Sequence, residues 1–182
     1  MGSDGEAMRV IAVVTARWNS TRLPGKMLAD INGKALIQWV VDRCKMSKVD
    51  EVVVATTSTS KPIIDYCFAH DISFDVGPEE DIVSRLYYTA LDYKADTIIR
   101  VWGDSPCVDP EIIDELMLLH SDYWYLDNGH KGTGAARLSF AKLERDYKTV
   151  IGIDRQWYHK YCWPDYSVDD EESLARVRSI LV

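Results

Sequence analysis

The run RVIAVVT at Arg9–Thr15 constrains the fold more than any other segment of this chain. It is rich in β-branched residues and lacks the polar alternation of a half-exposed strand, so it predicts a strand covered on both faces. A second such run, EVVVAT at Glu51–Thr56, follows a stretch at Ala35–Met46 whose apolar residues recur at helical spacing. Strands that alternate with helices are typical of right-handed βαβ crossovers, which build a parallel sheet.

The same alternation continues along the chain and predicts an α/β fold, with a mainly parallel sheet and helices on both faces. Further strands are expected at Ser73–Val76, Thr97–Val101, Tyr123–Leu126, Ala136–Ser139 and Tyr166–Val168. Further helices are expected at Pro62–His70, Glu79–Tyr93, Pro110–His120, Phe140–Asp146 and Glu171–Leu181. Pro62 suits a first helical turn, and Asp109 before Pro110 suits a helix cap.

The length of 182 residues and a hydrophobic share of 47% are those of one domain. Met1–Ala7 is small and polar and precedes a second methionine, so we interpret it as a leader or disordered tail and expect a single domain over 8–182. Apolar runs stay well below the roughly 18 residues that cross a bilayer, so we expect no membrane partner.

The net charge of −8 disfavours a nucleic-acid surface, which would need a basic face. The four cysteines are far apart and form no CxxC pair, which favours reduced thiols and a cytoplasmic location. Cys67 and His70 could share a helical face as metal ligands, but no second pair completes such a site. We therefore favour a buried thiol at Cys67.

A loop with three cations follows the first strand, with the sequence ARWNSTRLPGK at Ala16–Lys26. Ligands of open parallel sheets bind at the carboxyl ends of the strands, where this loop lies. Arg17 and Arg22 offer forked donors for phosphate oxygens, and Lys26 offers a compact charge. We expect the side chains of Arg17 and Lys26 to project from the loop into water and ligand, although a solvated loop with incidental charges is the alternative.

Two acidic segments also follow predicted strands. VWGDSP at 101–106 places Asp104 directly after a buried strand and a glycine, and SVDD at 167–170 places two aspartates after the last strand. Mg²⁺ usually takes one or two carboxylates together with substrate phosphates. A loop turn at Asp104 and a helix start at Asp170 are the structural alternatives.

The run ARWNSTRLPGKMLADINGK at Ala16–Lys34 resembles the amino-terminal motif of cytidylyltransferases, typified by CMP-KDO synthetase and the spore coat polysaccharide biosynthesis cytidylyltransferases. The similarity continues through VDEVVVATT, GPEEDIVSRLYYTA and RVWGDSPCVDPEIIDE, and it ends with YSVDDEESLARVRSIL. It covers Val10–Asn128 well and the remaining tail in part.

This resemblance implies a Rossmann-like nucleotidyltransferase that binds CTP and Mg²⁺, transfers CMP to an acceptor such as a sugar acid and releases pyrophosphate. A role in surface glycan precursor synthesis is implied as well. Arg17 and Lys26 match the triphosphate-binding residues and are the expected catalytic pair, while Asp104 and Asp169 match the metal-binding aspartates; Asp170 does not match. The expected nucleotide-binding residues are Ala16, Arg17, Ser20, Thr21, Arg22, Lys26, Arg85 and Trp102.

Some features depart from the family pattern or leave alternatives open. Arg85 lies where the family places residues near the base, but a charge on the helix surface explains it equally well. Trp18 and Trp102 are bulkier than expected beside the motifs, so they either reshape recognition or pack under the sheet. Arg137 stands where an acidic residue is expected, and the tail between Asn128 and Ser167 is short.

The short tail leaves the acceptor and a homodimer undecided, because that region helps form both in the full-length enzymes of the family. Two other functions therefore stay open. One is a non-catalytic nucleotide-binding module, and the other is a nucleotidyltransferase of the same fold that uses another nucleotide. Pyrophosphate release with a panel of nucleotides and acceptors separates the three.

Overall fold

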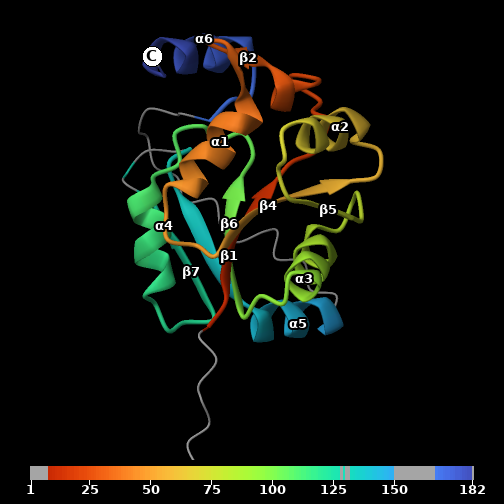
Figure 1. Cartoon of the computed structure of the whole chain (residues 1–182), viewed down its shortest axis with the longest axis vertical. Coiled ribbons are helices and arrows are strands. Elements are labelled where there is room, and N and C mark those ends of the chain that lie inside the picture. The colour runs from red at the N-terminus through yellow and green to blue at the C-terminus, as the bar shows by residue number, and fades with distance from the viewer. Residues whose placement is uncertain (1–7, 128, 130–131, 150–166, 182) are drawn as a thin grey trace, which may run out of the picture.

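Six strands form the central sheet in the computed structural model, which describes residues 8–127, 129, 132–149 and 167–181 (Figure 1). Their order across the sheet is β5-β4-β1-β6-β8-β7. Their bounds are β1 Val10–Thr15, β4 Glu51–Thr57, β5 Phe74–Gly77, β6 Thr97–Trp102, β7 Tyr123–Leu126 and β8 Ala135–Ser139.

The sheet is parallel from β5 to β6 and antiparallel beyond it. β1 pairs in parallel with both β4 and β6, and β4 pairs in parallel with β5. β8 runs antiparallel to β6 and to β7. A short connection suffices between antiparallel neighbours, whereas a parallel pair needs a crossover, and no helix separates β7 from β8 among the described residues. The predicted α/β fold with a mainly parallel sheet is confirmed.

Helices cover both faces of this sheet (Figure 1). One face packs against α1 Leu36–Lys45, α2 Lys61–Ala69, α4 Pro110–Met117 and α6 Glu171–Ile180. The other packs against α3 Ile82–Asp92 and α5 Phe140–Thr149. Alternate side chains of β1 point to opposite faces, so Ala12 and Val14 join the first core and Ile11 and Val13 the second. Burial on both faces explains why β1 is apolar from Val10 to Val14.

Carboxylate caps fix where α3, α4 and α6 begin, the last through Asp170. Asp81 accepts hydrogen bonds from the backbone N–H groups of Val83 and Ser84, so α3 begins at Ile82 and not at Glu79 as predicted. Asp109 accepts a hydrogen bond from Glu111 N, as expected for a cap before Pro110. Side-chain acceptors satisfy N–H groups that have no partner within the helix.

The cysteines that the structure describes are free thiols. Cys44 and Cys67 are buried, and burial raises the pKa of the Cys44 thiol to about 12 and that of Cys67 to about 11. The interpretation of Cys67 as a buried thiol is confirmed, while Cys162 lies outside the described residues. No helix in the described parts of the chain is long and apolar enough to span a membrane.

Several predicted elements need correction. Ser167 and Val168 form no strand, because the N–H of Val168 donates to Asp104 O and its carbonyl accepts from the Lys26 side chain, so neither group extends a ladder. Tyr166 lies outside the described residues. The loop after β1 also contains structure that the sequence analysis missed: a 3₁₀ turn, η1 Lys26–Leu28, and the small antiparallel pair β2 Asp30–Ile31 and β3 Lys34–Ala35.

Arg137, the residue found where an acidic one was expected, is buried in β8. Its guanidinium donates to the carbonyl oxygens of Ser121 and Leu116 and to Thr97 Oγ1. Leu116 belongs to the last turn of α4, and its carbonyl oxygen also accepts a hydrogen bond from Leu119 N at 3.4 Å. Arg137 therefore joins α4 to the antiparallel edge of the sheet, a role for which a carboxylate has no donors.

Gly103 allows the chain to leave β6 close to the end of β1. Its N–H donates to Thr15 O at 2.9 Å. A Cβ at this position would lie 2.7 Å from that oxygen and 3.2 Å from Met27 Sδ. The absence of a side chain thus brings the residue after Gly103 next to the loop that follows β1.

We predict that Gly103→Ala lowers the free energy of unfolding by about 1–3 kcal/mol, because backbone would have to move to relieve the contact. Chemical denaturation measures it. The control is Gly33→Asn, at a position with φ 85° and open space around the missing Cβ. Asparagine tolerates that backbone conformation, so the control should lose less than about 1 kcal/mol. Equal losses in both variants would contradict the close-approach explanation.

Candidate nucleotide and metal site

Three segments meet at the carboxyl end of the parallel strands. They are the loop after β1 at 16–26, the loop after β6 that begins at 103, and the segment 167–170 before α6. A backbone hydrogen bond of 2.8 Å from Val168 N to Asp104 O joins the last two segments. The structure therefore brings the predicted phosphate loop and both predicted acidic segments to one place.

Lys26 lies at the centre of this meeting point. Its Nζ donates to Asp104 Oδ2 at 2.7 Å, to the Val168 carbonyl at 2.8 Å and to Asp169 Oδ1 at 3.4 Å. Gly25, at φ 71°, precedes the η1 turn that directs Lys26 inward. The expectation that this side chain projects into water is wrong: it is 9% exposed, because three oxygen acceptors compensate for its burial.

The two predicted metal ligands, Asp104 and Asp169, both accept hydrogen bonds from the ammonium group of Lys26. Asp104 keeps 25% of its side-chain surface exposed and Asp169 keeps 17%, so water and ligands reach both carboxylates. Asp170 instead points into α6, where its carboxylate caps the helix through Ser173 N. That bond and the Ser173 hydroxyl lower the pKa of Asp170. The structure thus separates these adjacent aspartates, and only Asp169 faces Lys26.

Arg22 adds a second cation to the pair. Its Nη2 lies 2.9 Å from Asp169 Oδ1, and 65% of its side chain is exposed. Arg17 and Thr21 are also exposed on the same loop. The Ser20 hydroxyl accepts a hydrogen bond from Leu23 N at 3.3 Å. Arg17, as expected, is exposed on the loop, where it is available to an anion.

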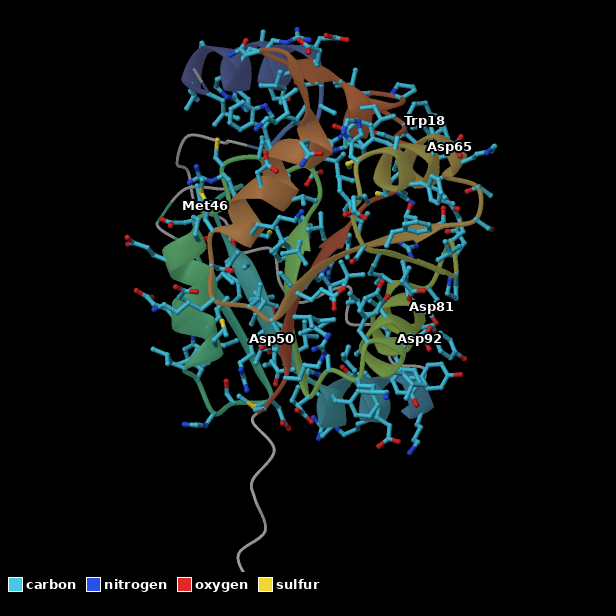
Figure 2. All side chains as sticks on the ribbon, in the orientation of Figure 1. Trp18, Met46, Asp50, Asp65, Asp81 and Asp92 are labelled. Atoms are coloured by element: carbon cyan, nitrogen blue, oxygen red, sulfur yellow. The ribbon has the colours of Figure 1, made fainter. Side chains whose placement is uncertain are left out.

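The start of the loop is anchored by two packed residues, Ala16 and Trp18. The Ala16 side chain is buried, and its N–H donates to Ala55 O, so this N–H is not available to a phosphate. The Trp18 ring packs where a Cβ of Gly25 would lie, 2.9 Å from its nearest ring atom. Trp18 N donates to Ser60 Oγ at the start of α2, and Figure 2 shows Trp18 beside that helix. Packing explains this bulky residue.

Arg85 is buried in α3 and does not form a surface charge, so that alternative is wrong. Its guanidinium donates to the carbonyl oxygens of Pro78 and Glu79 and shapes the loop between β5 and α3. Burial lowers the pKa of Arg85, and the nearby positive charge of Arg17 acts in the same direction. Arg85 therefore fixes the backbone at Pro78 and Glu79, close to Arg17.

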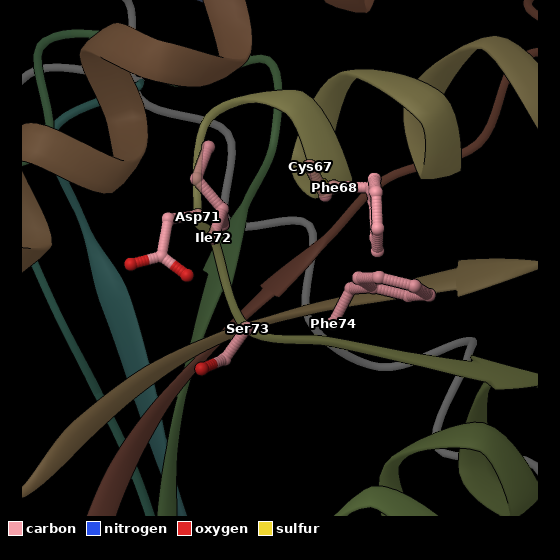
Figure 3. A pocket seen from close by; sticks show the side chains of 6 residues that line it. All are labelled: Cys67, Phe68, Asp71, Ile72, Ser73 and Phe74. Carbon is pink, nitrogen blue, oxygen red and sulfur yellow. The ribbon is translucent and has the colours of Figure 1, made fainter.

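Trp102 is not brought to the carboxylate pair. Its ring lies on the α3 side of the sheet, where it packs with the second core and contacts Arg100 and Tyr125. A hollow of about 390 Å³ between α2 and β5 also lies apart from the site (Figure 3). It is found at the amino end of β5, opposite to the strand ends that carry Lys26 and its partners.

Two carboxylates suit a divalent cation that arrives with its substrate. The described part of the chain contains no group of three or more His, Cys, Asp or Glu side chains that could hold a metal ion. Asp104 and Asp169 supply hard oxygen ligands, and Mg²⁺ characteristically completes such a pair with phosphate oxygens and water. The residues present therefore fit a metal shared with a bound phosphate group.

Two residues that shape the site, Val168 and Gly103, were not among the predicted site residues. The carbonyl of Val168 accepts a hydrogen bond from Lys26 Nζ, and Gly103 lets Asp104 lie close to the loop after β1. A glycine between a buried strand and a polar residue is a signal of close backbone approach. A backbone carbonyl as an ammonium acceptor leaves no signal in the sequence.

Comparison with known proteins identifies the family. A family model described as cytidylyltransferase matches residues 11–161. The 3-deoxy-manno-octulosonate cytidylyltransferase of Geobacter metallireducens is 38% identical over 109 residues, which are 59% of this chain and 43% of that protein. The spore coat polysaccharide biosynthesis protein SpsF of Bacillus subtilis is 32% identical over 159 residues, which are 81% of this chain and 66% of that protein. The chain belongs to the cytidylyltransferase family, and it spans less than two thirds of the length of these relatives.

Solved structures agree on the fold. CMP:2-keto-3-deoxy-manno-octonic acid synthetase complexed with CTP matches with a TM-score of 0.73 and 20% identity, covering 95% of this chain and 98% of that one. Rv0371c of Mycobacterium tuberculosis in complex with manganese matches with a TM-score of 0.65 and 14% identity, covering 94% of this chain and 99% of that one. These likenesses confirm the Rossmann-like fold predicted from the sequence.

We predict that Lys26→Met lowers the free energy of unfolding by about 1–3 kcal/mol, because two carboxylates lose the cation that lies between them. This is less than a fully buried pair would lose, since both aspartates are partly solvated. Lys34→Met is the matched control. The Lys34–Asp42 pair has a 2.6 Å separation, but its side chains are 38% and 34% exposed. The control should lose under about 1 kcal/mol in urea unfolding, and a Lys26→Met loss no larger than that would show that the buried contacts contribute little.

Proposed function

We propose that this chain transfers CMP from CTP to a hydroxyl group of an acidic sugar and releases pyrophosphate, with Mg²⁺ as its cation. The observation that carries the proposal is Lys26 bound between Asp104 and Asp169 at the carboxyl end of a parallel sheet. Family membership supports the choice of reaction, and the names of two relatives support CTP-derived chemistry on a sugar acid.

The cations of the loop after β1 act on the triphosphate. Arg17 is exposed at the start of the loop and Arg22 further along it, so both guanidinium groups are available to phosphate oxygens. Lys26 provides a fixed positive charge in a partly water-excluded position, which strengthens its interaction with developing negative charge. We assign Arg17 and Lys26 to transition-state stabilisation, and Ser20, Thr21 and Arg22 to binding.

Asp104 and Asp169 would hold the metal ion, whose chemistry is to neutralise charge on the phosphate oxygens and orient them. In the transfer, the acceptor oxygen forms a bond to the α-phosphorus while the bond from that phosphorus to the pyrophosphate oxygen breaks. The hydroxyl proton passes to solvent. The exposed arginines hold the phosphates in place for this displacement, so positioning accounts for most of the rate. Lys26 contributes its charge, because its ammonium group donates to Asp104, Val168 and Asp169.

The cellular role follows from the acceptor class. Activated sugar acids are precursors of surface polysaccharides, and the name of the Bacillus subtilis relative refers to spore coat polysaccharide biosynthesis. We therefore propose a role in glycan precursor synthesis in the cytoplasm, where CTP is available. The chain spans only part of each relative, so the test must measure the complete reaction and not only nucleotide binding.

The test of function is product formation. The protein is incubated with Mg²⁺, with CTP, UTP, ATP or GTP, and with 3-deoxy-manno-octulosonate or neutral sugars, and pyrophosphate release and product mass are measured. We expect pyrophosphate and the mass of a CMP-sugar acid with CTP only. Binding of CTP without product would support the non-catalytic module instead, and equal turnover of UTP would refute the base assignment.

We predict that Asp104→Asn and Asp169→Asn each reduce turnover by at least a hundredfold while the protein stays folded. The amide keeps the size of the side chain but removes the charge that balances the cation. Asp170→Asn is the adjacent control, because asparagine also caps a helix and this residue faces α6. Turnover as a function of Mg²⁺ concentration checks all three variants. An active Asp104→Asn enzyme with unchanged Mg²⁺ dependence would refute the metal assignment.

A further inference from the structure

One serine hydroxyl holds the backbone at the point where Asp169 and Asp170 diverge. Ser173 Oγ accepts hydrogen bonds from the backbone N–H groups of Asp169, at 2.8 Å, and Asp170, at 2.9 Å. Its own proton faces two oxygens of Asp170, Oδ1 at 2.7 Å and the backbone carbonyl at 2.9 Å. A hydroxyl has one donor and two acceptor positions, so these contacts use its full capacity. Ser173 is 5% exposed, so little water can replace it.

Every backbone N–H group of the segment 168–170 has a fixed acceptor. Val168 N donates to Asp104 O, and the next two N–H groups donate to Ser173 Oγ. Rotation of this backbone would break at least one of these hydrogen bonds. Side-chain rotamers are defined relative to the backbone, so a fixed backbone limits the directions in which the Asp169 carboxylate can project.

The direction of that projection decides which aspartate reaches the cations. Asp169 Oδ1 lies 3.4 Å from Lys26 Nζ and 2.9 Å from Arg22 Nη2. Asp170 Oδ1 instead accepts hydrogen bonds from the N–H group and the hydroxyl of Ser173. Two adjacent carboxylates are thus candidates for one metal position, and the Ser173 hydroxyl favours the arrangement that presents Asp169.

Helix α6 is also attached to the rest of the protein at its other end, independently of Ser173. Arg178 Nε donates to Asp30 O, and Asn32 Nδ2 donates to two carbonyl oxygens near the end of α6. Figure 1 shows α6 beside β2, the strand that contains Asp30. The anchoring of the helix and the direction of the aspartates can therefore be changed separately.

We propose that Ser173 is a positioning residue for the metal-binding carboxylate of Asp169. Its hydroxyl fixes the backbone so that Asp169 faces the metal position, and it keeps Asp170 as the helix cap. A partner that orients a metal-ligating carboxylate raises the metal affinity, because the ligand loses less freedom when the metal binds. This role rests on the proposed function and makes its metal site more specific.

The experiment measures Mn²⁺ binding in the presence of CTP by electron paramagnetic resonance, for the parent protein and three variants. Ser173→Ala should weaken Mn²⁺ binding by about ten- to a hundredfold, the usual effect of removing a group that orients a metal ligand. Ser173→Thr keeps the hydroxyl and should restore most of the affinity. Arg178→Ala is the control at the opposite end of α6, and it should lower the melting temperature but leave the affinity within about twofold.

A double-mutant cycle tests whether Ser173 acts through Asp169. The variant that combines Ser173→Ala with Asp169→Asn should bind Mn²⁺ no more weakly than Asp169→Asn alone, because the two changes remove the same interaction. Losses that add would overturn the proposal. A loss of affinity in Arg178→Ala as large as in Ser173→Ala would show a merely structural role and overturn it as well.

A crystal structure of Ser173→Ala separates the positioning role from the proposed function, because it needs neither metal nor turnover. Loss of the contact between Asp169 and Lys26 would support the positioning role, even where the parent protein bound no Mn²⁺ with CTP and the metal-dependent reaction was refuted. An Asp169 carboxylate that stays on Lys26 would overturn the positioning role, while the proposed function would stand. Ser173→Cys, whose sulfur is a weak acceptor, replaces Ser173→Ala in all these measurements should the alanine variant not fold.

Discussion

One buried ammonium group connects three parts of the chain that are far apart in sequence. Lys26 contacts Asp104, 78 residues away, and Val168, 142 residues away. A buried charge is costly unless it is paired and hydrogen-bonded, so folding must bring these partners together. The other features of the site follow from this requirement: Gly25 directs the lysine inward, Gly103 lets Asp104 approach, and the Asp170 cap leaves Asp169 to face the site.

This arrangement keeps two carboxylates close together in a protein whose net charge is −8. Their mutual repulsion would favour separation, and Lys26 and Arg22 compensate for it. The cations of the phosphate loop thus have a structural role as well as the proposed catalytic one. A phosphate group that enters with its own divalent cation would meet carboxylates that are already placed.

The sequence predicted the parts of the fold that depend on local pattern. The apolar run of β1 and the alternation that follows it predicted the parallel sheet and its helices, and motif resemblance predicted that Asp104 and Asp169 would meet. Features set by tertiary contact were not predictable. The burial of Lys26 depends on the Val168 carbonyl, which is 142 residues away in the sequence. Val168 itself is a β-branched residue typical of strands, but its N–H donates to the Asp104 carbonyl in a loop. In the sequence, Arg85 could equally be a charge on the helix surface. In the structure, its guanidinium is buried and donates to Pro78 O in the turn before α3.

The central claim is that Asp104 and Asp169 hold a divalent cation together with the phosphates of CTP. Anomalous diffraction from crystals grown with CTP and Mn²⁺ tests it most directly, because manganese can be located independently of the protein atoms. We expect one strong peak within coordination distance, about 2.0–2.4 Å, of an oxygen from each aspartate and from a CTP phosphate. CTP bound with its phosphates away from this pair, or manganese that contacts neither aspartate, would contradict it.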